Sequence, residues 1–377
     1  MIWIAFLPAT VYQCLAIYAG LRHLVKRHSN QLFARWRPSS GSPQATSPGV
    51  SVLKPLRGLD ANTYEAFVSQ IRQRYPTFEI LFGVREDDDS AAAEVRRLIR
   101  DFPDAPVRLI VGAASVPNGK VGVLMELARH ARYPVWVVND SDIKVGPTYL
   151  SGVTGSLVEP KVGLVTCLYR ARAHSLPATW EALGITTDFM PSALVASVIG
   201  VREFGFGSTL AFRAADLERV GGFAALADYL ADDYQLAKRI TSIGKSVLLS
   251  TYVVETSVNE FTWRGVWQHQ LRWARTIRVS KGLGYAGLPI THAGVWALIA
   301  LACGAWVTTT ILVFARIASA LITGGFVLRS SVGTAFCWLA PVWDVYAFAV
   351  WVESYVSREV RWRDRILAID SEGRIQV

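Results

Sequence analysis

Two aspartates, one residue apart, directly follow an apolar run in the middle of the chain. The run is Val135 to Val138, and the carboxylates are Asp140 and Asp142. Carboxylates at a strand end suit Mg²⁺ or Mn²⁺, which take oxygen ligands and often complete their coordination with substrate phosphates. A solvated loop explains roughly half of such Asp-x-Asp pairs, so their position in the fold must decide between the two interpretations.

A second acidic cluster, 86–89, follows the apolar run EILFGV at 79–84. If both runs are strands of one sheet, the two groups of carboxylates repel each other unless a positive charge lies between them or water surrounds them. A divalent metal that carries phosphates is one candidate for that charge. The sequence has no glycine-rich Walker-type phosphate loop, so a nucleotide would be held by the metal and by side chains.

A third acidic pair, Asp232 and Asp233, lies within YLADDYQLAK at 229–238, where apolar residues recur at helical spacing. One interpretation is a helix N-cap or a charged helix face, because Asp caps helices well. The other is a general base, a carboxylate that takes a proton from an attacking hydroxyl group.

The segment WQHQLRWARTIR at 267–278 combines an apolar stripe with a polar face that includes His269 and Arg272. Arg272 could reach a diphosphate, and Trp273 could pack against a substrate. Considered alone, the segment is more typical of a basic helix on a membrane surface.

An alternation of strands and helices must position these residues. The predicted strands are VSVL at 50–53, EILFGV at 79–84, VRLIV at 107–111, VWVVN at 135–139 and VGLVTCLY at 162–169. The predicted helices between them are Tyr64 to Tyr75, Ala91 to Phe102 and Val121 to Ala131. This order predicts an α/β domain with a mostly parallel sheet. Ligands then bind outside the carboxyl ends of the strands, where the first two acidic clusters lie.

The composition indicates a membrane protein. Of 377 residues, 51% are hydrophobic and 18% charged, and the mean hydropathy is +0.28. Ile2 to Leu21 has no charge and is followed by basic residues, which predicts an uncleaved anchor with its basic side in the cytoplasm. Ala293 to Ala315 and Val332 to Val352 have spanning length, the latter interrupted by Asp344, whereas Ile317 to Leu328 is short and typical of an interfacial or re-entrant piece.

The net charge of +9 fits basic residues beside apolar segments, where anionic lipids attract them. It does not favour nucleic-acid binding, because no basic stretch carries a base-stacking aromatic pattern. The four cysteines show neither disulfide-framework nor metal-site spacing.

Taken in order, four motifs resemble those of the ceramide glucosyltransferase family, which are membrane-bound inverting enzymes of the GT-A fold that use a nucleotide sugar. The motifs are GVREDDDSA, NDSDIKV, LADDYQLAK and HQLRW, and the resemblance covers about residues 50 to 280. It implies a GT-A, Rossmann-like cytoplasmic domain with N- and C-terminal transmembrane helices. The related processive polysaccharide synthases are less similar, because they have more spans and usually a complete Gln-x-x-Arg-Trp.

Within the family, the chain resembles most the bacterial hopanoid biosynthesis-associated glycosyltransferases. The segments that carry this resemblance are VGLVTCLYRAR, DFMPSALVAS, FGFGSTLAFR, LADDYQLAKR and TYVVET. It implies transfer of N-acetylglucosamine from UDP-GlcNAc to a bacteriohopanetetrol-type lipid at the bacterial inner membrane. The alternatives are ceramide glucosylation from UDP-glucose and, in another class, a non-catalytic membrane-anchored protein that binds nucleotide sugars.

The resemblance also implies roles for individual residues. The UDP-sugar would contact Glu86, Asp87, Asp88, Asn118, Lys120 and Asp140, and the divalent metal, Mg²⁺ or Mn²⁺, would bind Asp140 and Asp142. The catalytic set would be Asp233 as base with Asp232, Arg272, Trp273 and His269. Two residues depart from the family: His269 stands where the motif has Gln or Arg, and Met190 stands where animal ceramide enzymes have a functional His.

The predicted organisation is therefore a multi-pass protein with its catalytic domain in the cytoplasm. Its parts are an anchor at 1–22, a basic segment and linker at 23–49, a GT-A domain at 50–260, an amphipathic interfacial segment at 261–290, a transmembrane region at 291–353 and a tail at 354–377.

Overall fold

The computed structural model describes residues 2–36, 47–59, 62–258, 262–357, 359–362 and 365–376. Most of the predicted linker and the tip of the predicted tail lie outside these ranges. The chain divides into two compact units. We call Pro38–Tyr169 with Arg202–Ser257 the sheet unit, and Met1–Arg37, Arg170–Val201 and Val258–Val377 the helical unit.

The main sheet has seven strands in the order β3-β2-β1-β4-β6-β5-β7. Their bounds are β1 Val50–Pro55, β2 Phe78–Val84, β3 Val107–Val111, β4 Val135–Val138, β5 Val162–Ala173, β6 Leu210–Arg213 and β7 Ser246–Val258. β1 pairs in parallel with β2 and β4, and β2 with β3, whereas β6 is antiparallel to both β4 and β5. All five predicted strands are confirmed, while β6 and β7 were not predicted as strands.

The predicted helices of the sheet unit are confirmed as α2, α3, α4 and α9, whereas α5 and α8 were not predicted. The helices of the sheet unit are α2 Thr63–Ile71, α3 Ser90–Asp101, α4 Gly119–His130, α5 Tyr149–Thr154, α8 Ala214–Arg219 and α9 Asp232–Ser242. The buried faces of α4, α8 and α9 meet a core that includes Leu53, Val138, Phe212 and Leu236. Burying each such side chain contributes about 1.5–3 kcal/mol, which holds the strand ends in register beneath the acidic loops.

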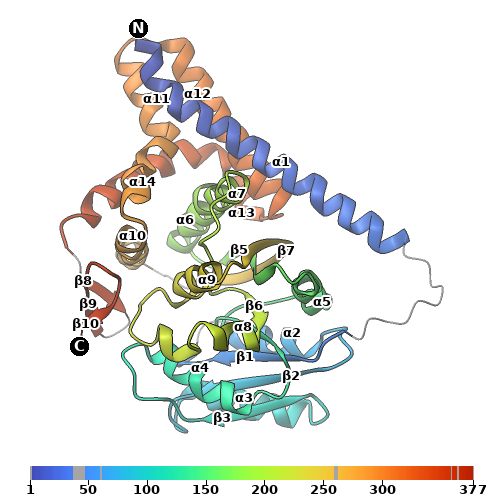
Figure 1. Cartoon of the computed structure of the whole chain (residues 1–377). Helices are drawn as coiled ribbons and strands as arrows, with labels where there is room; N and C mark the ends of the chain where they lie inside the picture. Colours follow the sequence, from blue (N-terminus) through green and yellow to red (C-terminus); the bar gives the residue numbers. More distant parts are fainter. Residues whose placement is uncertain are drawn as a thin grey trace. The chain divides into compact units, whose positions relative to one another are not determined.

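The helical unit contains the long apolar helices. Its helices are α1 Leu7–Trp36, α6 Leu176–Gly184, α7 Met190–Val198, α10 Trp263–Ala286, α11 Ala293–Ala302, α12 Trp306–Ala320, α13 Ser331–Ala335 and α14 Ala340–Ser354, and its small sheet is β8 Glu359–Trp362, β9 Arg365–Ile369 and β10 Ile375–Gln376. α12 packs against both α1 and α11, and Figure 1 shows the three side by side. Among the described residues, two helices are long and apolar enough to cross a membrane, Ile4–Ser29 and Trp306–Val327.

The C-terminal spans differ from the prediction. The segment Ala293 to Ala315 divides into α11 and α12, because Gly304 takes the left-handed conformation (φ 69°) that ends a helix. The short piece Ile317 to Leu328 instead continues α12 through a π-helical segment, Leu321–Val327. The predicted span Val332 to Val352 divides as well, with Pro341 in the first turn of α14. No charged residue lies at these breaks, so hydropathy alone does not predict them.

Asp344, which interrupts the third apolar segment, is paired inside the helical unit. The nearest Arg316 nitrogen lies 2.7 Å from its Oδ1, and Arg316 Nη1 donates to the carbonyl of Thr187 at 2.7 Å. The backbone N–H of Gly294 donates to Asp344 Oδ2 at 2.8 Å. The two charges therefore link α12, α14 and the segment before α7, and neither is left uncompensated.

Candidate active site

Lys120 is the centre of a charged cluster in the sheet unit. Its Nζ lies 2.9 Å from Asp140 Oδ1 and 3.2 Å from Asp232 Oδ2. Burial lowers the pKa of Lys120, but the carboxylates of Asp140, Asp232 and Asp233 more than offset this and hold the pKa above its usual value. Lys120 is therefore a fixed positive charge at the carboxyl ends of the parallel strands.

Asn118 positions Lys120 at the start of α4. Its side-chain Oδ1 caps the helix by accepting from the N–H groups of Lys120 and Val121 at 3.0 and 3.3 Å. Its Nδ2 donates to the carbonyl of Tyr229 at 2.7 Å, just before α9 begins. The buried amide thus ties the first turn of α4 to the loop that presents Asp232. The contact of Asn118 with the diphosphate that the resemblance implies stays a prediction.

Gly207 joins the two parts of the acidic site and was not singled out from the sequence. Its N–H donates to Asp233 Oδ2 at 3.0 Å, and its carbonyl accepts from the N–H of Asp140 at 3.0 Å. A Cβ added at Gly207 would lie 2.5 Å from Asp140 Oδ2. Only glycine allows this approach. The signal in the sequence was the glycine pair of FGFGSTLAFR immediately before an apolar run.

Asp233 has the electrostatics of a base that works near neutral pH. Burial raises its pKa, repulsion from Asp232 adds to this, and Lys120 opposes it, giving a pKa of about 6. The side chain is half-buried in the first turn of α9, where Oδ1 accepts from the N–H of Tyr234 at 2.7 Å. The sequence left an N-cap open as the alternative, but the N-cap position is Ala231.

Lys54, the second cation of this edge, was overlooked in the sequence. It lies near the end of β1, between the acidic ends of β2 and β4, is fully buried, and donates from Nζ to the carbonyl of Asp140 at 2.8 Å. Burial lowers its pKa to about 8, against the opposite influence of Asp142 and Asp140. The signal in the sequence was a lysine directly after the apolar run VSVL. Lys54 supplies the positive charge that the two acidic strand ends require.

Asp142 is directed toward the end of β7. Its Oδ2 accepts from the hydroxyl of Thr256 and, at 3.1 Å, from the N–H of Ser257. Burial raises the pKa of Asp142, whereas the Thr256 hydrogen bond lowers it. Asp142 Oδ2 is therefore hydrogen-bonded within the protein. Asp140 is the more open carboxylate, with 42% of its side chain exposed.

The donor set can be tested for the predicted divalent metal. Among the described residues, no group of three or more His, Cys, Asp or Glu side chains could hold a metal ion. Mg²⁺ and Mn²⁺ are nevertheless commonly bound by one or two carboxylates together with substrate phosphates. Asp140, with Asp142 beside it, fits a metal that arrives with a diphosphate and does not fit an all-protein cage.

The acidic cluster after β2 is exposed. Asp87 pairs with Arg96, and Glu86 lies 3.9 Å from Arg85. Asp88 is exposed, whereas Asp89 caps α3 and accepts from the N–H of Gly58 at 2.9 Å. The cluster follows β2 at the edge of the sheet where β1 and β4 also end, as parallel pairing requires. Among the described residues, no ion pair joins Glu86, Asp87 or Asp88 to Lys120.

The HQLRW residues lie on α10 in the helical unit, and the predicted helix is confirmed. His269 Nδ1 hydrogen-bonds with Oε1 of the fully buried Glu181, which also accepts from Gln270 Nε2 at 2.9 Å. The His269 ring lies 4.9 Å from the ring of Trp273. Glu181 was missed because a glutamate inside LPATWEALG looks like an ordinary polar helix position.

Fold and site together define a class of protein. The chain has a GT-A-like α/β fold, with carboxylates and lysines at the ends of parallel strands. A mannosyltransferase from Pyrobaculum calidifontis, solved in complex with GDP-Man and Mn²⁺, shares the fold with a TM-score of 0.52 and 20% identity, covering 92% of this chain and 98% of that chain. The family profile described as glycosyl transferase family 21 matches residues 1–375. The chain belongs to this family, so the expectation of a glycosyltransferase enzyme is confirmed at the family level.

Similar curated proteins include two from Caenorhabditis elegans. Ceramide glucosyltransferase 1 is 32% identical over 213 residues, which are 56% of this chain and 46% of that protein. Ceramide glucosyltransferase 3 is 29% identical over 209 residues, 54% and 45% of the two chains. The chain thus spans about half the length of the curated relatives it matches. The resemblance to the ceramide glucosyltransferase family is confirmed, and the closer resemblance to hopanoid-associated enzymes stays a prediction.

Proposed function

We propose that the protein transfers a sugar from a UDP-sugar to the hydroxyl group of a membrane lipid, with inversion at the anomeric carbon. The observation that carries the proposal is the cluster of Lys120, Asp140, Asp232 and Asp233 at the carboxyl ends of the strands. It combines a carboxylate suited to accept a proton with charges suited to a diphosphate. A protein that only binds nucleotide sugars needs no such base.

In the proposed mechanism, Asp233 takes the proton of the lipid hydroxyl group. The hydroxyl oxygen forms a bond to the anomeric carbon, and the bond from that carbon to the diphosphate breaks, so the electron pair leaves with UDP. A positioned carboxylate typically contributes on the order of 10² to 10⁴ in rate. The N–H of Gly207 donates a hydrogen bond to Asp233 Oδ2, which fixes the orientation of the carboxylate that acts as base.

Lys120 and Lys54 would balance the charge of the diphosphate. Lys120 keeps its proton because carboxylates surround it, so it offers a permanent cation. A divalent metal, held by Asp140 with Asp142 as helper, would supply Lewis-acid stabilisation of the leaving diphosphate. Glu86, Asp87 and Asp88 would contact the uridine, while Arg272, Trp273 and His269 would contribute the remaining family contacts.

The lipid acceptor implies a site at a membrane. The two helices of spanning length, Ile4–Ser29 and Trp306–Val327, support membrane attachment, and the basic residues after Leu21 support a cytoplasmic catalytic domain. We propose a multi-pass protein of a bacterial inner membrane.

Two pairs of donor and acceptor are candidates. The names of the relatives support glucose transfer from UDP-glucose to ceramide. The resemblance to hopanoid-associated enzymes supports N-acetylglucosamine transfer from UDP-GlcNAc to a bacteriohopanetetrol-type lipid. Met190, which stands in place of the histidine of animal ceramide enzymes, argues against the ceramide pair. Met190 is fully buried beside the π-helical segment Ile185–Phe189, so it offers no polar group to an acceptor.

The product mass decides between the pairs. Membranes that contain the protein are incubated with UDP-glucose or UDP-GlcNAc and with each lipid, and the lipid extract is analysed by mass spectrometry. A hexosylceramide supports the first pair and a hexosamine-labelled hopanoid the second. Donor binding without UDP release or any glycolipid, with all four combinations, would instead indicate a binding protein.

A further inference from the structure

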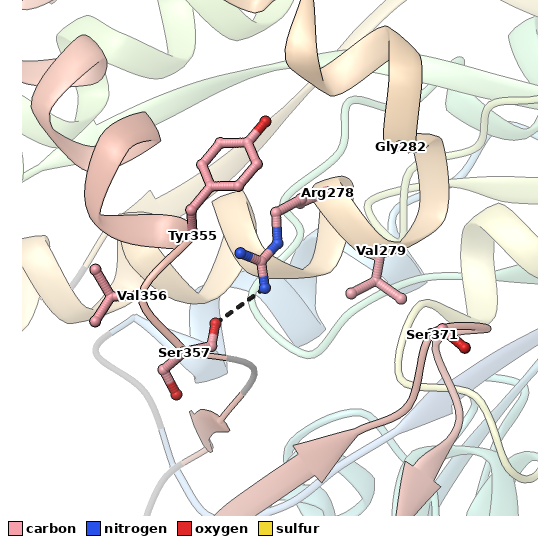
Figure 2. Close-up of a pocket in the computed structure, with 7 residues that line it drawn as sticks. All are labelled: Arg278, Val279, Gly282, Tyr355, Val356, Ser357 and Ser371. Carbon is pink, nitrogen blue, oxygen red and sulfur yellow. Dashed lines mark hydrogen bonds between the residues drawn. The ribbon is translucent and has the colours of Figure 1, made fainter.

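A cavity of about 550 Å³ opens on the helical unit, next to α10. Figure 2 shows the residues that line it, which are Arg278, Val279, Gly282, Tyr355, Val356, Ser357 and Ser371. They come from α10, from the chain after α14 and from the turn between β9 and β10. No residue predicted for catalysis or for the UDP-sugar is among them.

Arg278 gives this cavity a positive charge. Its guanidinium lies 5.2 Å from the centre of the Tyr355 ring, and Nη2 donates to the carbonyl of Ser357 at 3.0 Å, as the dashed line in Figure 2 shows. In the described part of the chain, no carboxylate lies within ion-pair distance of Arg278. A guanidinium has five N–H donors, so most of them remain for a ligand.

Exposed apolar side chains occur in the lining and next to it in sequence. Val356, which lines the cavity, is 81% exposed, and Leu283, which follows the lining residue Gly282, is 95% exposed. α10 is kinked at Lys281 and Gly282, so Leu283 follows the kink rather than continuing the helix that carries Arg278. Exposed aliphatic side chains, an aromatic ring and an arginine together are typical of the boundary between lipid headgroups and acyl chains.

We propose that this cavity binds the phosphate of an anionic phospholipid headgroup. Arg278 donates to the phosphate oxygens, with Ser371 at the rim, and the acyl chains lie along Leu283 and Val356. Charge complementarity favours this occupant, because arginine pairs well with phosphate and a neutral or cationic ligand would leave the guanidinium uncompensated. The site is separate from the proposed sugar transfer and would anchor α10 to the membrane surface.

Native mass spectrometry of the full chain in detergent tests the proposal. The protein is mixed with equal amounts of phosphatidylglycerol and phosphatidylcholine, and the retained lipid is counted. We expect wild type to retain phosphatidylglycerol preferentially and Arg278→Gln to retain roughly tenfold less of it, since a charge-assisted hydrogen bond is lost. Inorganic phosphate is added separately, and we expect it to displace the lipid only weakly because it lacks the acyl chains.

Arg275→Gln is the matched control. Arg275 lies one turn earlier on α10, does not line the cavity, and donates to the carbonyl of Glu359. If both substitutions reduce phosphatidylglycerol equally, the attraction comes from the basic surface and the proposal is wrong. It is also wrong if inorganic phosphate displaces the lipid completely at equal concentration.

Two further variants test the proposal if Arg278→Gln does not fold. Val279→Trp fills the cavity without changing charge, and we expect it to reduce phosphatidylglycerol retention as well. Arg278→Lys keeps the charge but not the planar fork, and we expect intermediate retention. Full retention by Val279→Trp would place the lipid elsewhere and overturn the assignment.

Discussion

The two units of the molecule each contain a cluster of opposite charges, and the two clusters differ in burial and in the number of carboxylates around each cation. In the helical unit, Arg316 forms a direct ion pair with one carboxylate, Asp344, at 3% and 0% side-chain exposure, and Asp188 is a further carboxylate nearby. In the sheet unit, Lys54 and Lys120 face four carboxylates, Asp140, Asp142, Asp232 and Asp233. The first cluster is complete within the protein and stabilises helix packing. The second has excess negative charge and an open carboxylate, which is the state expected of a site that receives a metal and a diphosphate.

The largest effect is expected from Asp233→Asn, which removes the proposed base. We expect kcat to fall by about 10² to 10⁴ while the affinity for the UDP-sugar stays within about twofold, because the amide keeps the shape but cannot accept the proton. Turnover is measured as UDP release with lipid acceptor, and donor binding by calorimetry. Near-wild-type turnover would show that Asp233 is not the base.

In the cluster of the helical unit, Asp344→Asn should affect stability rather than chemistry. It leaves Arg316 buried without its partner, so we expect the free energy of unfolding to fall by about 3–5 kcal/mol. The measurement is denaturant unfolding of the purified chain in detergent. Asp142→Asn in the cluster of the sheet unit is the comparison, and we expect it to lower stability by less because it removes one of several excess negative charges. Equal losses would mean that the two clusters have the same structural role.

Gly207→Ala tests how closely the backbone must approach Asp140. A methyl group there would lie 2.5 Å from Asp140 Oδ2, so either the loop or the carboxylate must move. We expect kcat/KM to fall about 10- to 100-fold, the range in which displacement of a positioned group reduces rate. Gly119→Ala is the control, since a Cβ at Gly119 has no neighbour within 4 Å. A similar loss in both variants would contradict the proposed approach.

The pH dependence of kcat/KM tests how the neighbouring carboxylate affects the pKa of Asp233. Because the pKa of Asp233 is raised to about 6, the base form is present above pH 6 and is lost as the pH falls through it, so kcat/KM should decline by up to about tenfold per unit below that value. In Asp232→Asn the like charge is gone, and we expect the acidic limb to move to lower pH. An unchanged limb in this variant would show that Asp232 does not raise the pKa of Asp233.

The smallest effect concerns Glu181 and His269 on the helical unit. If Glu181 orients His269, the combined effect of Glu181→Gln and His269→Gln on the acceptor KM should be smaller than the sum of the single effects, with a coupling of about 0.5–3 kcal/mol. The readout is KM for the lipid against kcat, with thermal unfolding as the check on folding. Additive effects would mean that Glu181 serves packing alone.

Local sequence determined much of the fold. Apolar residues that recur with a period of two or of 3.6 residues are a local property of the sequence. The five strands and the helices α2, α3 and α4 were therefore predicted close to their observed bounds, and α10 was predicted over its central part. The motifs of Asp140 and Asp142 and of Asp232 and Asp233, which lie in the charged cluster around Lys120 and Lys54, were likewise found from residue type and position. The breaks in the C-terminal apolar segments were not, because hydropathy reports only that a segment is apolar and not where its helices turn.

Only the tertiary structure decided which charges meet. Lys54 and Lys120 are 66 positions apart in sequence, and Gly207 lies more than 60 positions after Asp140, yet β1, α4 and the loop before β6 bring these residues to one edge of the sheet. Strand order determines such neighbours, and strand order depends on long-range packing that no local pattern encodes. The sequence alone therefore determined the acidic groups, whereas the folded chain determined the cations that hold them, the glycine that separates them and the pKa that makes Asp233 suited to be a base.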